Sequence, residues 1–394
     1  MRRPSTEPNV PPRGPFAPLR GSWPFRTRLV AFGLLVVILV GAATALASHY
    51  ADGYFLFAPG TAPSITANPA CKPSQGQLAL PNGAPCVRLV VPKGKAHALD
   101  GKLLMVDVEV SQAGPWDWAL YELGLLGGDR QMISVASYAG TTPTSELGCQ
   151  DTQLMVSANE DAALAALGEL HYKVGEDPEG AEVTEVLAGT PAWDAGLKCN
   201  DLITAVNGKP VTDAAEFTNA FQGLPPGSVV TLSDHPASGG RARTVRVTLE
   251  KTPPKMVALG FPTRAYVGLA VQTRARLVLP FTVSVNAGDI GGPSAGLAFT
   301  LAMLDALSGG KLTGGHVVAA TGTIAPNGQV GDVGGVQEKA VAVEKAGAQV
   351  FFVPSVEYKV AKSVVGNRLR VVPVTTLAQV LHVLQSDYGG SLTG

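Results

Sequence analysis

Two side chains of this sequence have the types that a hydrolytic enzyme needs, a hydroxyl and an amine. Ser294 lies in the glycine-rich stretch GDIGGPSAGLAF, residues 288–299, directly before an apolar segment. Lys339 lies in QEKAVAVEKA, residues 337–346. A serine becomes a nucleophile when a base removes its proton, and an amine with a lowered pKa is such a base. The pair could therefore attack a carbonyl carbon.

The serine is expected at the start of a helix over residues 294–307, after a strand at 281–286. A helix N-terminus presents free amides and a positive dipole end, which favour developing negative charge. We expect the backbone around Gly292, Pro293 and Ala295 to hold the oxyanion. Serine is also a favoured helix cap, so its position alone leaves a purely structural role open.

The lysine is expected on the buried face of a helix. At about 100° per residue, it shares one arc with four apolar residues: Val336, Ala340, Val343 and Ala346. Glu338 and Lys345 lie opposite. A lysine in a buried stripe is unusual, and burial would lower its pKa from about 10.4 towards about 7–8. The alternative is that its stem covers apolar surface while the amine reaches water.

The chain that positions these groups begins with a candidate membrane anchor. Residues 29–47 contain no charge, and six arginines but one acid precede them. About 1.5 Å per residue lets this run cross a bilayer core of about 30 Å. The charge bias predicts a cytoplasmic tail at residues 1–28 and a catalytic domain outside the cytoplasm. Because residues 45–47 resemble a small-residue cleavage site, a removed signal peptide is the alternative.

Composition excludes several classes of function. The net charge is −1 and no long basic run occurs, so we expect no nucleic-acid partner. No phosphate-binding GxxxxGK[ST] motif, HExxH motif or CxxC pair occurs, so we expect no ATP, metal or cofactor. Four cysteines (Cys71, Cys86, Cys149 and Cys199) allow three pairings, among which the sequence does not choose.

The rest of the chain predicts an α/β multidomain protein of two or three domains. Residues 52–170 are expected to form a loose stalk, up to residue 85, followed by an α+β region. Residues 171–252 alternate strands and short helices, with an Asn207-Gly208 hairpin turn. Residues 253–262 suit a linker, and 263–394 form the last domain.

Residues 171–252 resemble a PDZ domain of the kind found beside exported bacterial proteases, through GTPA, AGL and VNGKPV. The resemblance implies binding of an extended peptide by strand addition, with a terminal carboxylate held by backbone amides. The segment His171–Gly175 is a weak candidate for that carboxylate-binding loop.

The last domain resembles the proteolytic domain of Lon-type serine proteases, in DIGGPSAG, TGTIAPNGQVGDVGG and QEKAVAVEKAGA. The group most similar in organisation is the membrane-anchored PDZ–Lon-like proteases (YlbL type). The resemblance implies that Ser294 is the nucleophile, Lys339 the general base and Thr321 an orienting residue. In classical Lon an acidic residue lies three positions before the serine. That position is Gly291 in this sequence, and the nearest acidic residue is Asp289. A ring-shaped oligomer, a hexamer, is also implied.

The sequence thus predicts an ATP-independent membrane serine endopeptidase that cleaves unfolded or loose polypeptides. One alternative is a non-catalytic PDZ adaptor with a Lon-like fold. Another is an esterase of the α/β-hydrolase type, because GPSAG fits the GxSxG nucleophile motif. Limited self-processing is a third possibility.

Overall fold

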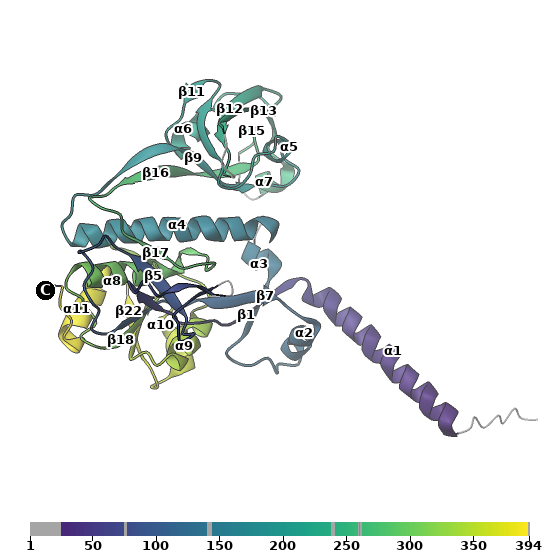
Figure 1. The fold of residues 1–394 in the computed structure, drawn as a ribbon. Coiled ribbons are helices and arrows are strands. Elements are labelled where there is room, and N and C mark those ends of the chain that lie inside the picture. The colour runs from purple at the N-terminus through teal and green to yellow at the C-terminus, as the bar shows by residue number, and fades with distance from the viewer. Residues whose placement is uncertain are drawn as a thin grey trace, which may run out of the picture.

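The computed structural model describes residues 25–74, 77–139, 144–237, 241–258, 260 and 262–392. It contains a long N-terminal helix that projects from the rest of the chain, an α/β body and a smaller β-rich body (Figure 1). The predicted α/β multidomain class is confirmed. Most of the predicted basic tail, residues 1–24, lies outside the described residues.

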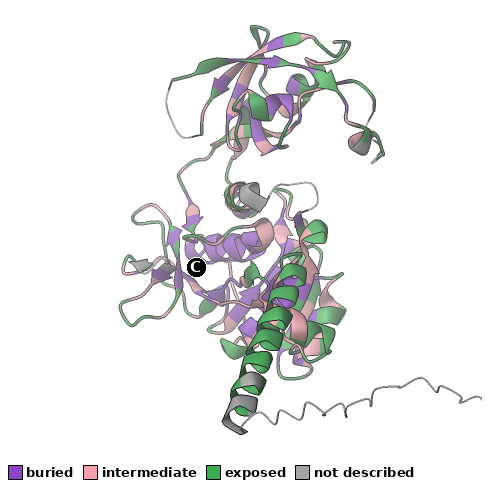
Figure 2. Ribbon diagram, turned by 90° about the vertical axis from the view of Figure 1, so that its right-hand side faces the viewer, coloured by how far each residue is buried: buried purple, intermediate pink, exposed green. Residues whose placement is uncertain are grey.

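The N-terminal helix α1 (Phe25–Ala51) is the candidate anchor. Its 20-residue window Phe32–Ala51 has a mean hydropathy of 2.0 and is 6% buried. The helix leaves the α/β body and is exposed along most of its length (Figure 2). By length and composition it can cross a membrane.

The α/β body is built on a seven-stranded sheet of order β17-β5-β2-β6-β18-β21-β22. The strands are β17 (Ser284–Asn286), β5 (Cys86–Val90), β2 (Ser64–Thr66), β6 (Lys102–Leu104), β18 (Val317–Ala320), β21 (Val350–Pro354) and β22 (Arg370–Val374). The run β6-β18-β21-β22 is parallel. Its central strands are buried on both faces, as parallel strands generally are.

This sheet differs from the expected division of the chain. Strands β2, β5 and β6 come from residues 52–170, and the other four follow residue 263. Ile65, in the segment expected to be a loose stalk, is 1% exposed and belongs to the main core. The segment before the PDZ-like region is therefore structurally part of the body that carries Ser294.

Helices cover both faces of the sheet. On one face lie α8 (Gly296–Leu307), α11 (Leu377–Tyr388) and the C-terminal half of α4 (Thr144–Glu169). On the other face lie α9 (Val336–Lys345) and α10 (Tyr358–Val365). Neighbouring β21 residues Phe351 and Phe352 point into the two different cores, as alternation along a strand requires.

The smaller body is an antiparallel sheet of order β13-β12-β10-β9-β16. Its strands are β9 (Gly175–Val186), β10 (Leu202–Val206), β12 (Val229–His235), β13 (Arg243–Thr248) and β16 (Leu269–Val278), and β11 (Lys209–Pro210) pairs with β10. The helices are α5 (Pro191–Asp194) and α6 (Ala214–Asn219). The predicted turn at Asn207-Gly208 joins β10 to β11, with both residues at positive φ. Strand β16 lies beyond the expected boundary at residue 252.

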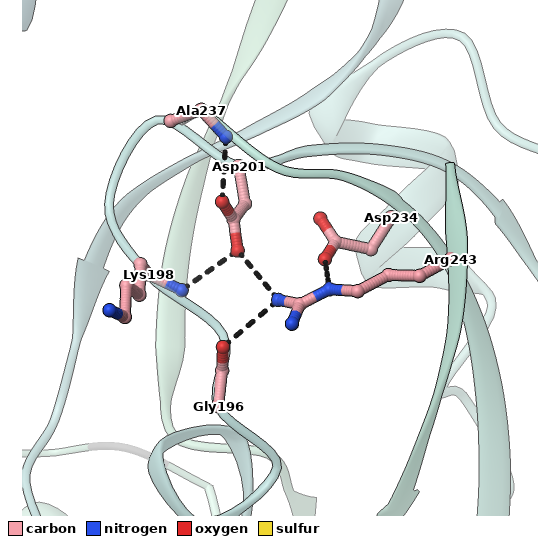
Figure 3. Close-up of polar contacts among 6 residues, drawn as sticks. All are labelled: Gly196, Lys198, Asp201, Asp234, Ala237 and Arg243. Carbon is pink, nitrogen blue, oxygen red and sulfur yellow. Dashed lines mark hydrogen bonds and ion pairs between the residues drawn. The ribbon is translucent and has the colours of Figure 1, made fainter. Parts of the chain in front are cut away.

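A polar cluster fixes one loop of this body (Figure 3). The Arg243 guanidinium donates to Asp234 at 2.6 Å, to Asp201 at 3.4 Å and to the Gly196 carbonyl at 3.0 Å. Asp201 also accepts from the Lys198 amide at 2.9 Å. The cluster therefore holds the loop that contains Cys199.

Two disulfides resolve the open pairing, Cys71–Cys86 and Cys149–Cys199. The first lies within the α/β body. The second ties the start of α4 to the loop at Cys199, and Gln153 of α4 donates to the Val183 carbonyl of β9 at 2.9 Å. In Figure 1, α4 accordingly lies between the two bodies.

A small sheet of order β7-β1-β8 stands beside α1, with helices α2 and α3. Its elements are β1 (Tyr54–Pro59), β7 (Val108–Gln112), α2 (Pro115–Glu122), β8 (Gln131–Ser134) and α3 (Val135–Ala139). The remaining elements are short: β3 (Lys72–Ser74), β4 (Gln77–Ala79), β14 (Glu250–Lys251), α7 (Pro254–Ala258), β15 (Ala265–Tyr266), η1 (Pro293–Ala295), β19 (Thr323–Ile324) and β20 (Val330–Gly331).

Candidate active site

Ser294 lies in the three-residue 3₁₀ turn η1, which leads into the buried helix α8. Helix α8 begins at Gly296, and neither η1 nor α8 has a side-chain cap. The hydroxyl is therefore not used as a helix cap. The Ser294 carbonyl accepts from the Gly322 amide at 2.9 Å and from Thr321 Oγ1 at 3.1 Å. Two bonds thus fix the main chain at the serine.

Lys339 lies on the sheet-facing side of α9 and is 2% exposed. Its Nζ donates to Thr321 Oγ1 at 3.4 Å. Thr321 follows β18 and is fully buried, and its hydroxyl donates in turn to the Ser294 carbonyl. The structure therefore brings Lys339, Thr321 and Ser294 together, although they come from three separate segments.

Burial lowers the pKa of the Lys339 amine to about 8, despite the opposing charges of Glu357, Asp107 and Glu338. Desolvation disfavours the ammonium form more than these carboxylates favour it. At pH 7 roughly a tenth of the amine is therefore neutral, far more than for an exposed lysine, and the neutral form is the proton acceptor.

Glu338 does not lie on a wet face, contrary to the helical-wheel expectation. It is fully buried, burial raises its pKa, and neither carboxylate oxygen has a hydrogen-bond partner among the described residues. The loop at Gly128 lies against this side of the helix, because the Gly128 carbonyl accepts from Gln337 Nε2 at 2.7 Å and the charge of the next residue, Asp129, contributes to raising the Glu338 pKa. Lys345 is exposed as expected, whereas Ala346 is exposed although it was expected to be buried.

A cavity of about 660 Å³ contains both Ser294 and Lys339 in its wall. Gly292, Pro293, Ala295 and Asp289 line it too. The other walls come from β1, the segment around β7, α3 and the start of α4: Phe55, Phe57, Met105, Val106, Asp107, Val108, Val110, Gln112, Tyr138, Leu147, Asp151 and Met155. A cleft of this size suits a peptide segment.

The amides expected to hold an oxyanion are partly occupied. Pro293 has no N–H, so Gly292, Ser294 and Ala295 supply the donors. The Gly292 amide donates to the Asp151 carbonyl at 2.8 Å. Asp289 is exposed at the cavity rim. Among the described residues no hydrogen bond joins the Ser294 hydroxyl to Lys339.

Three acidic residues near these groups were missed in the sequence: Asp107, Asp151 and Glu357. Glu357 accepts from the Val333 amide at 2.9 Å, burial raises its pKa, and its charge raises that of Lys339. Asp107 binds the Thr61 amide and hydroxyl. No local pattern marks these acids, because each meets the site through tertiary contacts.

A second cavity, of about 390 Å³, lies in the β-rich body. It is lined by Phe217 and Thr218 of α6, by Phe221, and by residues 264–271, which lead into the edge strand β16. Gly268 has φ +84°, and a Cβ there would meet the Thr190 side chain at 2.2 Å. The weak candidate His171–Gly175 is not among the lining residues, and its Tyr172 packs against Phe281 instead.

No group of three or more potential metal ligands occurs among the residues that the structure describes.

Comparisons with known proteins fit both bodies. Residues 282–386 match the model of the Lon protease (S16) C-terminal proteolytic domain, and residues 182–233 match that of a PDZ domain. The chain thus carries a PDZ domain and a Lon-type proteolytic domain, which supports the class of serine proteases.

Individual relatives match one part or the other. The chain is 38% identical to the serine protease PepD of Mycobacterium tuberculosis over 23% of this chain and 19% of that protein. It is 33% identical to the Lon protease of Chloroflexus aggregans over 24% of this chain and 12% of that protein. It is 34% identical to a probable DegP-like periplasmic serine endoprotease of Chlamydia pneumoniae, over 34% of this chain and 28% of that protein. The chain therefore matches less than a third of each of these relatives.

Among solved structures, the PDZ domain of an SdrC-like protein from Listeria monocytogenes matches 24% of this chain and 87% of that chain, at 20% identity. Its TM-score is 0.20, which is too low to support a comparison of folds.

Proposed function

We propose that this protein is a membrane-anchored, ATP-independent serine endopeptidase that uses Ser294 and Lys339 as a catalytic pair. The observation that carries the proposal is the buried Lys339 amine, with a pKa of about 8, in the wall of the same cavity as Ser294. Burying a protonatable amine costs folding free energy, and perturbed pKa values concentrate at functional sites.

In this mechanism neutral Lys339 accepts the Ser294 proton while Oγ bonds to the scissile carbonyl carbon. Thr321, which accepts from Lys339 Nζ and donates to the Ser294 carbonyl, orients the amine. The ammonium then gives its proton to the departing amine, and an acyl-enzyme remains. Water then loses a proton to Lys339 and attacks the ester carbonyl carbon, and Lys339 returns that proton to Ser294 Oγ as the Oγ–carbonyl bond breaks. Free backbone amides of residues 292–295 hold the oxyanion. The Gly292 amide takes part only when it releases the Asp151 carbonyl; otherwise the Ser294 and Ala295 amides hold the oxyanion.

The PDZ domain is proposed to bind an extended polypeptide beside β16. This strand is at the edge of its sheet, and Phe217 and Phe221 form an apolar wall facing residues 264–271. An added peptide strand would hydrogen-bond to the edge and place alternate side chains in the groove. Unfolded or loose polypeptides are the proposed substrates.

Helix α1 is proposed to anchor the protein with its N-terminus in the cytoplasm and both bodies outside. Six arginines against one acid before the apolar run support that orientation. Two disulfides fit an oxidising compartment. A ring of subunits, as the resemblance to Lon-type proteases implies, is proposed to shield the cavity from folded proteins.

The test compares four full-length proteins on an unfolded casein-like substrate: the parent, Ser294→Ala, Lys339→Ala and Lys345→Ala. Lys345 is the matched control, since it lies on the same helix with a side chain 68% exposed. We expect only the parent and Lys345→Ala to cleave, and a fluorophosphonate probe to label Ser294. Cleavage by both site variants at the parent rate would refute the mechanism. An inactive, unlabelled parent that still binds peptides would indicate a PDZ adaptor.

A further inference from the structure

The carboxylates that line the cavity with Ser294 have no part in the proposed mechanism. Asp151, near the start of α4, lines the cavity that contains Ser294. Its carbonyl accepts from the Gly292 amide at 2.8 Å. A Cβ on Gly291 would come within 2.8 Å of the Asp151 Cβ. Asp151 therefore packs directly against the loop that carries the serine.

The Asp151 carboxylate is half-buried, and within the described part of the chain no hydrogen bond or ion pair reaches it. Burial raises its pKa. Burial, followed by the charge of Asp151, also raises the pKa of Tyr138, which lines the same cavity. The carboxylate therefore lies near the Tyr138 hydroxyl, on the cavity side of α4.

Acidic side chains outnumber basic ones among the described residues that line this cavity. Asp107 is satisfied by Thr61, and Asp289 adds a further negative charge at the rim. Lys339 is the one basic residue among the described lining residues, and its Nζ donates to Thr321, while burial alone shifts the pKa of Asp151. No basic side chain of the described lining residues therefore competes with an incoming cation for the Asp151 carboxylate.

The walls beside this carboxylate are apolar and aromatic. Phe55 and Phe57 each pack edge-on against Tyr138, with ring centroids 5.4 Å apart. Met105 and Met155 line the same space. A lysine or arginine side chain matches such a slot, because its stem packs on apolar surface while its charged end reaches a carboxylate or an aromatic face. A neutral side chain would bury the carboxylate without a partner, which costs binding energy.

We propose that Asp151 is a specificity-determining residue, which selects polypeptides carrying an arginine or lysine within two residues of the scissile bond. The proposal rests on the proposed function of Ser294. It narrows the substrate class from loose polypeptides in general to basic segments of them.

The experiment uses the full-length protein in detergent and quenched-fluorescent peptides in matched pairs. The two peptides of a pair differ at one position, which is arginine in one peptide and its neutral isostere citrulline in the other. This position is moved in turn through the two residues before and the two residues after the scissile bond. We expect kcat/KM to be at least about tenfold higher for arginine at one of these positions, a factor typical of a paired, partly desolvated charge. Asp151→Asn should bring the ratio of kcat/KM for arginine and citrulline peptides close to one, and Asp151→Lys should favour citrulline over arginine.

The matched control is Asp161→Asn. Asp161 lies on the same helix and is also half-buried with a pKa raised by burial, to about 6, but it does not line the cavity. Ten residues along a helix place it about 15 Å away. It should keep the arginine preference.

The outcomes separate the two proposals. A parent that cleaves no peptide and whose serine is not labelled overturns the proposed function. A parent that cleaves both peptides of every pair equally, or an Asp151→Asn protein that keeps the parent's arginine preference, overturns the assignment of Asp151 and leaves the catalytic pair standing.

Discussion

Replacing Lys339 by methionine should stabilise the α/β body, because the folded state pays to bury a protonatable amine. The pKa of Lys339 falls from 10.5 to about 8. The difference of about 2.5 units, at about 1.36 kcal/mol per unit, amounts to about 3 kcal/mol. This value already includes the attraction of Glu357, Asp107 and Glu338. Methionine fills a similar space without a charge.

The pH dependence gives this prediction its sign. Between about pH 8 and 10.5 the unfolded chain binds the Lys339 proton and the folded chain does not, so stability rises with pH across that window. The destabilisation is therefore fully present at pH 7 and vanishes above pH 10.5. The stabilising effect of Lys339→Met should be large at pH 7 and small at high pH.

Calorimetry of the full chain in detergent, in a Ser294→Ala background that prevents self-cleavage, measures this effect. For a body of this size about 3 kcal/mol corresponds to a Tm increase of roughly 6–12 °C at pH 7. Lys345→Met, on the exposed face of α9, should change Tm little. Equal Tm values for Lys339→Met and its background at pH 7 would show that the amine is not desolvated, and the reasoning about the base would fail with it.

Three further predictions concern the two sites. The rate of Ser294 labelling should rise with pH to a plateau, with a midpoint near the Lys339 pKa of about 8, because only the neutral amine accepts a proton; a flat profile from pH 6 to 9 would contradict this. Thr321→Val should lower kcat roughly tenfold with little change in KM, and Thr321→Ser should restore it, since the hydroxyl holds the Lys339 amine. Gly268→Ala should abolish peptide binding by the PDZ domain and lower its stability, because φ is +84° and the new Cβ would overlap Thr190; unchanged binding by titration calorimetry would show that the groove is not built as described.

Much of the candidate site could be predicted from local sequence. Lys339 lies at helical spacing from several apolar residues, so the periodicity of the sequence predicts its burial. In the structure Lys339 is 2% exposed. The Asn207-Gly208 turn and the apolar helix α1 are equally local signals, and the structure contains both. The catalytic roles of Ser294 and Lys339 stay predictions.

The helical wheel misplaced Glu338 for a physical reason. A wheel assumes one buried face and one wet face, but α9 packs on the sheet on one side and against the loop at Gly128 on the other. Only a contact between residues more than two hundred positions apart reveals the second face.

The same reason explains why the sequence placed the start of the last domain at residue 263, although the sheet of that domain includes earlier strands. Strands β5 and β17 pair although the whole PDZ domain separates them in the sequence, and neither strand carries a local mark of its partner. The walls at Phe55, Tyr138 and Asp151 of the cavity that contains Ser294 come from the segment to which the sequence assigned no chemistry.

Sequence alone determined which residue types are present, where the chain is apolar enough to span a bilayer, and which face of α9 carries an amine. Tertiary structure decided what surrounds that amine, which cysteines pair and which side chains complete the cavity. Periodicity and turn chemistry act over a few residues, whereas desolvation and pairing depend on segments that meet only when the chain has folded.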